Sequence, residues 1–598
     1  MEAHGNTRLD TVSRYGLIIL AVVQGFTLYL LHLSIDHEVW PASDPRWLMA
    51  FYALAGGLPV FFYLGLERVT ERRNAWAAAT VGPLLFGLGW HLGWLRWGAG
   101  LELPDRSYFT FIFFVSVGVS LFILALYFRI WCINRTPRFD YRQLLEHSWQ
   151  HALTLALLGL FLGTFWLLLV LWGELFDIIG VSFFEELFEE PVFLYPASAF
   201  VGGWGLVLIR ERIRLVATVQ SMCEVLIKAL LPLAALIGIL FLGALPFTGV
   251  TNIWETGHAA VLMMSLAIVL LFFFNSVLSE NPEHPPYPTW IQALVIFGVF
   301  LLPLNSLLAA WALGLRIEQY GLTVDRLWAA TIQLLIAGFT LSYSVLILLR
   351  RTRALGAIQS ANKVLAFVVA GVLMLVNTPA ADMRAWAAES QVNRLLNGDV
   401  EADTFDYNYL RFNLGAYGVM ELRKLQGSEF AKQNPLVADR VDAVLKQDTR
   451  WKHKPVVDKN DRQAVADMFM VIPQGTIIPE PLLDILAKNN EYCLSTPKQC
   501  QLVKTQPHSG IAYWLLVTNR HGSYISGNAY SSESGSMKAI GGLSSPGCHE
   551  SGEAGFTEDT KLVPVESPFV AFTDGQCFYL IQPNIHYFRE SRQSAAPS

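Results

Sequence analysis

Long apolar stretches fill the chain before residue 380, and none follows it. A helix needs roughly 20 apolar residues to cross a bilayer core of about 30 Å. Because the stretches approach or reach this length, they predict a bundle of membrane-spanning helices. There are eleven candidates, near residues 15–33, 48–66, 77–95, 109–131, 151–173, 193–209, 228–246, 258–278, 290–313, 327–349 and 363–380.

The composition agrees with a membrane protein. Hydrophobic residues make up 53% of the chain and charged residues 15%, whereas soluble domains average about 25% charged residues. The first apolar stretch is too long for a signal peptide and lacks a small-residue cleavage pattern after it, so we interpret it as a retained helix. The net charge of −6 and the lack of a long basic patch argue against nucleic-acid binding.

The short loops carry an orientation signal. Counted along the predicted bundle, sixteen Lys and Arg residues lie on the side of the N-terminus and five on the other side. Basic loops face the cytoplasm, so we expect a cytoplasmic N-terminus. With eleven helices the segment after residue 380 is periplasmic. If the number of spanning helices differed by one, this segment would lie on the cytoplasmic side.

The fold class predicted is an α-helical polytopic membrane bundle of about 11 helices, followed by a small α+β extracytoplasmic domain. We divide the chain into a transmembrane domain (1–380), a mainly helical periplasmic segment (381–500) and a small disulfide-containing β-rich segment (501–598). In the last segment, short β-type runs are expected at 511–518, 523–530, 569–572 and 577–582. The Ser- and Gly-rich run 531–555 is expected to be a loop.

Four of the six cysteines lie in the predicted periplasmic part: Cys493, Cys500, Cys548 and Cys577. In an oxidising compartment they predict two disulfides. Three pairings are possible, and the short loops favour Cys493–Cys500 and Cys548–Cys577. Free thiols or a zinc site are the alternatives, although the spacing contains no C-x-x-C pair.

Polar residues inside predicted spans are the first candidates for function, because burying them in a membrane is costly. We single out His91, Asn275 and Asn305. Gly89 and Gly93 flank His91 with a spacing that permits close helix approach. His91 is interpreted either as a hydrogen-bond partner of a neighbouring helix or as a proton-relay or ligand residue.

An acidic run on the predicted outer side is the second candidate. Glu185, Glu186, Glu189 and Glu190 share one face of a helix over Phe183–Pro191, opposite an aromatic face. This pattern is typical of a helix lying at the membrane interface. Clustered carboxylates also suit hard cations, so a cation-binding patch is the alternative.

No sequence motif predicts catalysis. The chain has no G-x-S-x-G, and the histidines after residue 380 lack the spacing of a zinc-binding helix. We therefore assign no catalytic residue, cofactor or metal, and favour a protein that is not an enzyme.

Three segments carry a family resemblance: Arg316–Trp328 reads RIEQYGLTVDRLW, Glu389–Gly398 reads ESQVNRLLNG and Phe405–Gly418 reads FDYNYLRFNLGAYG. With the acidic run FDIIGVSFFEELFEEPVF at Phe176–Phe193, they make residues 1–420 resemble the multi-pass membrane family known as domain of unknown function 4153. The resemblance implies a bacterial, membrane-integral protein and assigns no activity.

The aromatic residues of Phe405–Gly418 have two interpretations. Tyr407, Tyr409, Arg411 and Tyr417 either dock the soluble part onto the outer loops or fill the core of the soluble part. For the whole chain we favour a membrane-anchored binding or sensing module, with the lipid bilayer and a periplasmic protein as partners. The alternative is a transporter or flippase of an unidentified small molecule or lipid.

Overall fold

Two compact units make up the chain, residues 1–445 and 446–598, and each is described by itself. The computed structural model describes residues 9–97, 107–249, 259–277, 286–350, 353–447, 461–489, 493–494, 500–505, 513–521, 524–533, 536–544, 563–565, 571–573 and 578–583.

Unit 1 is built from helices, and each apolar stretch named above coincides with most of a long helix, although the last stretch extends past the end of its helix at Leu375. The long helices are α1 (Thr11–Asp36), α2 (Pro45–Gly65), α3 (Arg72–Trp97), α4 (Ser107–Asn134), α5 (Tyr141–Ile178), α7 (Pro191–Glu211), α8 (Ile213–Thr248), α10 (Ala259–Val277), α11 (Thr289–Tyr320), α12 (Val324–Arg350) and α13 (Ala354–Leu375). The shorter helices are α6 (Phe183–Glu189), α14 (Met383–Asn397), α15 (Tyr407–Asn413), α16 (Gly415–Gln426), α17 (Glu429–Gln433) and α18 (Pro435–Leu445).

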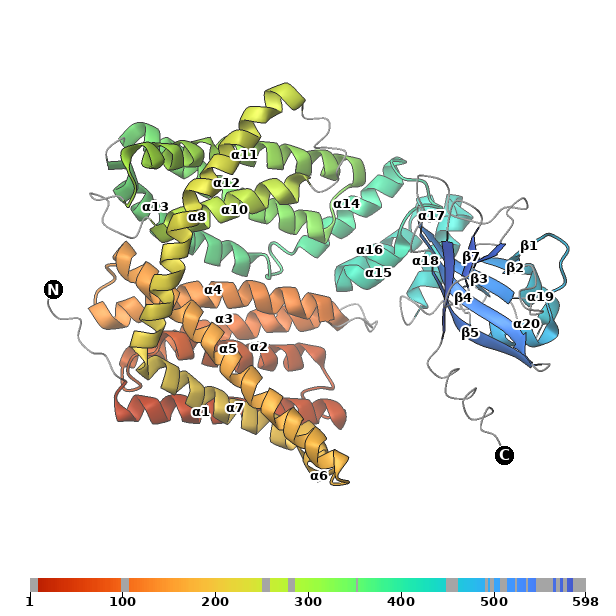
Figure 1. Cartoon of the computed structure of the whole chain (residues 1–598), viewed down its shortest axis with the longest axis horizontal. Helices are drawn as coiled ribbons and strands as arrows, with labels where there is room; N and C mark the ends of the chain where they lie inside the picture. Colours follow the sequence, from red (N-terminus) through yellow and green to blue (C-terminus); the bar gives the residue numbers. More distant parts are fainter. Residues whose placement is uncertain are drawn as a thin grey trace. The chain divides into compact units, whose positions relative to one another are not determined.

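The long helices form two groups, each with its own hydrophobic core. The first core is built mainly from α1, α2, α3 and α4, and the second from α8, α10, α11 and α12. Helix α13 contributes Met374 to the first core and Ile358 to the second. Figure 1 shows the two groups, with α5 and α8 running obliquely across the other helices.

Ten helices in the described residues are long and apolar enough to cross a membrane. Helix α3 is the predicted span that does not reach this threshold, because arginine, alanine, glycine and histidine replace larger apolar residues along it. It nevertheless runs antiparallel to α2 over the length of that helix. Leu85 faces Gly57, and Gly93 faces the backbone of Pro45.

The helices after α13 are amphipathic and enclose a small core of their own, built from α14, α15, α16, α17 and α18. Val324, the first residue of α12, belongs to the same core. These helices therefore belong to unit 1 with the long helices. The division expected at residues 380 and 500 stays a prediction.

Unit 2 contains one sheet of eight strands in the order β1-β2-β3-β4-β5-β8-β7-β6. Pairing is antiparallel except between β1 and β2, which are parallel. Apolar residues of the sheet and of helices α19 and α20 form its core, including Leu482, Trp514 and Tyr530. The elements are α19 (Arg462–Asp467), β1 (Met470–Ile472), α20 (Glu480–Asn489), β2 (Gln501–Lys504), β3 (Tyr513–His521), β4 (Tyr524–Glu533), β5 (Ser536–Ser544), β6 (Val563–Val565), β7 (Ala571–Thr573) and β8 (Phe578–Pro583).

Three expectations for unit 2 have an outcome. The β-type runs expected at 511–518, 523–530, 569–572 and 577–582 overlap β3, β4, β7 and β8. The disulfide Cys493–Cys500 is present, with both cysteines buried in the core. The run 531–555 was wrongly expected to be a loop throughout, because β5 lies within it and pairs with both β4 and β8. Cys548 and Cys577 lie outside the described residues.

Candidate functional site

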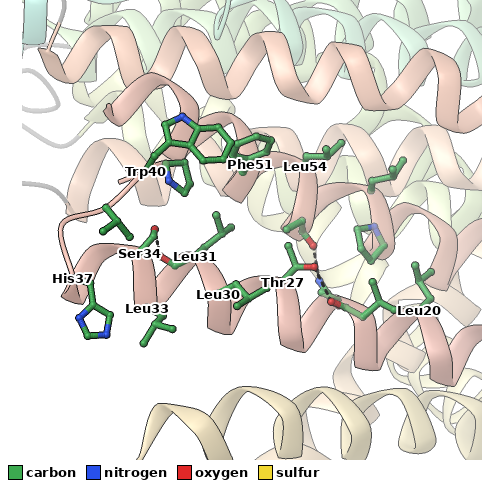
Figure 2. A pocket seen from close by; sticks show the side chains of 17 residues that line it. Leu20, Thr27, Leu30, Leu31, Leu33, Ser34, His37, Trp40, Phe51 and Leu54 are labelled. Atoms are coloured by element: carbon green, nitrogen blue, oxygen red, sulfur yellow. Dashed lines mark hydrogen bonds between the residues drawn. The ribbon is translucent and has the colours of Figure 1, made fainter. Parts of the chain in front are cut away.

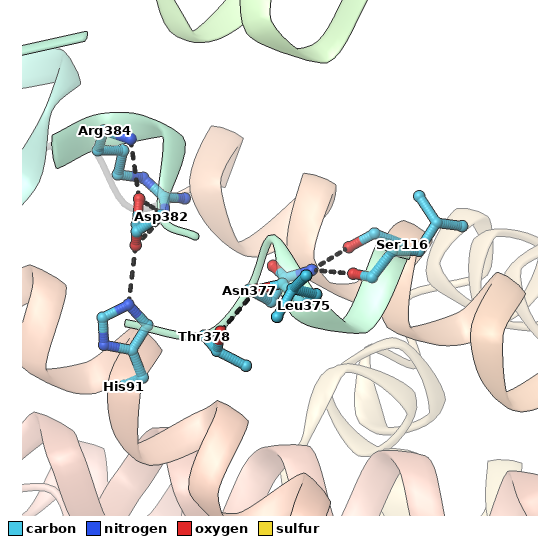
Figure 3. Close-up of polar contacts among 8 residues, drawn as sticks. His91, Ser116, Leu375, Asn377, Thr378, Asp382 and Arg384 are labelled. Atoms are coloured by element: carbon cyan, nitrogen blue, oxygen red, sulfur yellow. Dashed lines mark hydrogen bonds and ion pairs between the residues drawn. The ribbon is translucent and has the colours of Figure 1, made fainter. Parts of the chain in front are cut away.

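His91 lies in a buried ionic cluster with two residues that follow α13. Its Nε2 is 2.8 Å from Oδ2 of Asp382, and the Arg384 guanidinium lies 3.3 Å from the same oxygen. The Asp382 side chain is 0% exposed and the His91 side chain 6%. Figure 3 shows the carboxylate between the imidazole and the guanidinium.

Local structure explains how these groups meet. Gly89 and Gly93 hold α3 against the backbone of α2, because a Cβ at either position would collide with that backbone. The Asp382 carboxylate caps α14 by accepting a hydrogen bond from the backbone N–H of Arg384, 2.9 Å away. An aspartate at this position satisfies an N–H that the first helical turn leaves unpaired.

The segment between α13 and α14 is tied to the first helix group. The Asn377 amide donates to the Ser116 hydroxyl on α4, 2.9 Å away, and Thr378 donates to the carbonyl of Leu375 (Figure 3). These bonds fix the path of the chain before it reaches Asp382.

Charge governs the protonation of this cluster. Burial raises the pKa of Asp382, but the hydrogen bond from His91 and the positive charge of Arg384 outweigh burial, so the pKa lies below its ordinary value of 3.8. The carboxylate is therefore ionised at neutral pH. A buried carboxylate requires such partners because an unpaired buried charge is strongly unfavourable.

Aromatic residues cover the cluster. The Trp94 ring stacks on His91 at 5.8 Å between centroids, and Tyr417 of α16 meets Trp94 edge-on at 5.2 Å. Tyr417 thus holds α16 against α3, whereas Tyr407 packs in the core formed by α14, α15, α16, α17 and α18. Docking onto the outer loops stays a prediction.

The other half of α14 is bonded to the turn between α11 and α12. Arg394 donates to the carbonyls of Glu318 and Gln319 at 3.2 and 2.9 Å, and Gln391 donates to that of Leu322 at 2.8 Å. The last carbonyls of a helix lack partners within it and attract positive charge. Arg394 therefore supplies hydrogen-bond donors to carbonyls at the C-terminal end of α11.

Two further bonds secure this turn. The backbone N–H of Leu322 donates to the Ser390 hydroxyl at 3.2 Å, and that of Val324 donates to the Tyr409 hydroxyl at 3.0 Å. The three segments that carried the family resemblance thus meet at one place in the fold. We call this region, with the cluster around Asp382, the α14 junction.

The structure does not bring His91 together with the other intramembrane candidates. Asn275, near the end of α10, accepts hydrogen bonds from Tyr343 and Asn362, both 2.8 Å away. Asn305 donates to the carbonyl of Met263 near the start of α10, 2.8 Å away. Twelve residues of helix separate Met263 from Asn275, which is about 18 Å, so the candidates form separate contacts.

Glu185, Glu186 and Glu189 lie in α6, which ends before Glu190 and is therefore shorter than the helix expected over Phe183–Pro191. The aromatic face of α6 packs against α5 and α7. Phe184 and Phe188 contact Trp172 at 5.2 and 6.0 Å, whereas Glu186, Glu189 and Glu190 are exposed. Repulsion from Asp177 raises the pKa of Glu185, and burial and the charges of Glu174, Glu189 and Glu186 add to this effect. Among the residues that the structure describes, no group of three or more His, Cys, Asp or Glu side chains could hold a metal ion.

The His91 ring contacts Asp382, Trp94 and Tyr417. The Asp382 carboxylate orients the imidazole through its contact with Nε2, so the α14 junction connects α3 to the start of α14.

A family model described as "Domain of unknown function (DUF4153)" matches residues 74–425, more than half of the chain. The chain belongs to the DUF4153 family. The match begins at α3 and ends in α16, so the DUF4153 region contains the whole α14 junction, and unit 2 lies beyond it. No curated protein and no solved structure matches the chain.

Sequence reasoning found His91 but missed its partners. Asp382 and Arg384 stand just past the last apolar stretch, where polar residues are expected and attract no notice. The available signal was the N-cap pattern of an aspartate before a helix. Nothing in the sequence indicated that this cap lies beside a histidine 291 positions earlier.

Proposed function

We propose that the chain is a membrane-anchored binding or sensing module of the bacterial inner membrane, with its C-terminal part in the periplasm. The observation that carries this proposal is the bridging position of α14. Its first residues are bonded to α3 through Asp382, and its second half is bonded to the α11–α12 turn through Arg394. These two attachments belong to different helix groups, so a change at α14 reaches both.

The positions of the helix ends support the periplasmic location. At one end of the bundle, Arg14 of α1 pairs with Glu211 of α7 at 2.7 Å, and Arg73 of α3 donates to the Trp131 carbonyl of α4 at 2.8 Å. This end is basic and fits the cytoplasmic side. Helix α3 runs from there to His91 at the α14 end, so counting it as a span gives eleven crossings.

The disulfide in unit 2 supports the same location. Disulfides persist in the periplasm and are rare in the cytoplasm, where thiols are kept reduced. The Cys493–Cys500 bond therefore fits an outward-facing unit 2.

The intramembrane polar residues give less support to transport. Asn305 and Gln333 each donate to a backbone carbonyl of a neighbouring helix, at 2.8 and 2.7 Å. Such bonds hold helices together inside a membrane. A transporter or flippase needs side chains that face a path, so these contacts favour a binding module over the alternative.

Cysteine labelling on intact cells tests the location. Glu429→Cys lies on α17 near the α14 junction, and Arg138→Cys lies between α4 and α5; both positions are exposed. With the native cysteines other than Cys493 and Cys500 replaced by serine, an impermeant maleimide should label position 429 on intact cells and position 138 only after lysis. The reverse pattern refutes the proposed orientation.

Photo-crosslinking in living cells tests the binding role. A photoreactive amino acid replaces Ile477 of unit 2, which is 88% exposed, or Leu160 on the exposed surface of α5 as a control. A binding module should give discrete protein adducts from position 477 and none from position 160. Loss of every adduct at exposed positions of unit 2 contradicts the proposal.

A further inference from the structure

An apolar groove of about 540 Å³ lies between α1 and α2. Figure 2 shows its walls, with His37 and Trp40 at one end. The described residues that line it include no aspartate, glutamate, lysine or arginine, and the Gln24 amide is bonded to Ala55 and Tyr63 at 2.9 and 2.6 Å. The groove therefore offers no fixed charge to a ligand.

Fixed charges gather instead where α2, α4 and α7 end. One oxygen of the Glu67 carboxylate accepts from Nε of Arg129 at 2.5 Å and from Nη2 of Arg210 at 3.4 Å. Arg210 is also bonded to the carbonyls of Tyr63 and Leu66, at 3.2 and 2.9 Å. The Glu67, Arg129 and Arg210 side chains are 14%, 13% and 8% exposed. Two guanidiniums thus share one carboxylate, which leaves one positive charge in excess at a mostly buried place.

The Arg129 guanidinium has donors that the protein does not use. A guanidinium carries N–H groups on Nε and on both Nη atoms, and Nε is the one that bonds Glu67. The Nη1 and Nη2 groups make no hydrogen bond to the described residues. Such a pair of parallel N–H groups matches two oxygens of a phosphate or a carboxylate.

His151 of α5 adds a buried polar group beside these charges. It is 2% exposed, and neither ring nitrogen has a hydrogen-bond partner among the described residues. The charges of Arg129 and Arg210 and the backbone of Leu64 act on the ring, which places it next to the same end of α2. A buried polar group without a protein partner commonly bonds a water or an ion. An anion attracted by the guanidiniums supplies the acceptor that the imidazole N–H lacks.

We propose that Arg129, Arg210 and His151 bind a phosphate group. A phosphodiester carries one negative charge and so balances the excess charge of the cluster, as buried charges require. The cluster lies at the basic end of the bundle, and basic pockets between membrane helices on the cytoplasmic side bind anionic lipid head groups. A free phosphate ion offers the same chemistry. The site is separate from the α14 junction and does not depend on the proposed binding role.

Native mass spectrometry of the full chain tests a lipid as the source of the phosphate. The protein is released from nanodiscs that contain equal amounts of anionic phosphatidylglycerol and zwitterionic phosphatidylethanolamine, and bound lipids are counted. Arg142→Gln is the matched control for Arg129→Gln, because Arg142 is an exposed arginine near the start of α5 that pairs with Glu146 at 2.9 Å. The wild type and Arg142→Gln should retain phosphatidylglycerol equally. Arg129→Gln should retain about tenfold less, because charge-assisted hydrogen bonds are lost.

Glu67→Gln separates ligand binding from a folding defect. The substitution removes the carboxylate that repels an anion and occupies Nε of Arg129. Retention of phosphatidylglycerol should therefore rise above that of the wild type, whereas a misfolded site would retain less.

Thermal unfolding of the delipidated chain in detergent tests the free ion. Millimolar inorganic phosphate should raise the Tm of the wild type, relative to chloride at equal ionic strength, and leave that of Arg129→Gln unchanged. Lipid retention that depends on Arg129 without this rise assigns the site to a lipid head group, and the rise without such retention assigns it to the free ion. If neither measurement distinguishes Arg129→Gln from Arg142→Gln, the phosphate site is refuted.

Discussion

Replacing Asp382 by alanine tests whether the buried cluster holds α14 in place. The variant leaves His91 and Arg384 buried without the carboxylate that they share. Removing one partner of a buried ion pair costs about 3–5 kcal/mol, and loss of the helix cap adds about 1 kcal/mol. Asp406→Ala is the matched control, since Asp406 caps α15 at 2.9 Å from the Tyr409 N–H but is exposed.

Thermal unfolding of the purified full chain, followed by tryptophan fluorescence, measures the difference. The chain has 18 tryptophans, so their emission reports on unfolding of the whole chain. The fall in Tm should be about four to six times larger for Asp382→Ala than for Asp406→Ala. Equal shifts would show that Asp382 acts only as a helix cap.

The pH dependence of the same comparison has a defined sign. Because the folded pKa of Asp382 lies below 3.8, the unfolded chain binds the proton more readily. The carboxylate therefore stabilises the fold fully above that pH, and its contribution disappears as the pH falls through the folded pKa. The stability difference between the wild type and Asp382→Ala should shrink as the pH falls below about 4. A loss that is complete by about pH 5 contradicts the lowered pKa.

Three further substitutions probe other contacts. Gly93→Ala should lower the free energy of unfolding by about 1–3 kcal/mol because the added methyl group collides with α2. Gly87→Ala is the control and should be neutral or slightly stabilising, because a Cβ there meets nothing within 4 Å. Thermal unfolding compares the two variants, and equal effects would refute the close approach of α3 to α2. Replacing both Cys493 and Cys500 by serine should lower the free energy of unfolding of unit 2 by about 2.5 kcal/mol, because the disulfide closes a short loop. In urea, a reductant should make the wild type more sensitive to protease and leave the variant unchanged. Tyr343→Phe removes a hydroxyl buried between two asparagines and should cost about 1–3 kcal/mol; an unchanged Tm contradicts that bonding.

The helices could be predicted from sequence because the membrane imposes a simple rule. Every backbone polar group in hydrocarbon must be paired, so each long apolar stretch becomes a helix. The same rule explains the one weak case. Helix α3 contains too many small and polar residues to meet a hydropathy threshold, yet Gly89 and Gly93 give it a close contact with α2 that compensates for smaller apolar side chains.

The sheet of unit 2 was predicted less completely because its strands lack the usual composition. β5 reads SMKAIGGLS, and serine and glycine are typical of loops. Gly527 in β4 lies so close to the Leu516 carbonyl of β3 that no Cβ fits there. Glycine at this position allows the two strands to approach closely, and only the folded structure reveals this.

The partners of His91 were beyond sequence reasoning for a different reason. Hydrophobic periodicity indicates which face of a helix is buried, but not which distant residue meets it. Asp382 and Arg384 lie in a segment that is polar in any case. The pairing depends on how α13 returns the chain to α3, which is a property of the tertiary fold.

The chemistry at the two ends of α14 bears on its role. A buried ion pair often stabilises a protein no more than apolar side chains of equal volume do. Apolar contacts would therefore hold α14 equally well if its role were only to cover the bundle. Ionic and hydrogen-bonded contacts differ in being directional, so they fix position and register. Asp382 fixes α14 against α3, and Arg394 fixes it against the end of α11. Since each helix group has a separate core, these directional contacts connect the two groups through α14, and the proposed sensing role rests on that connection.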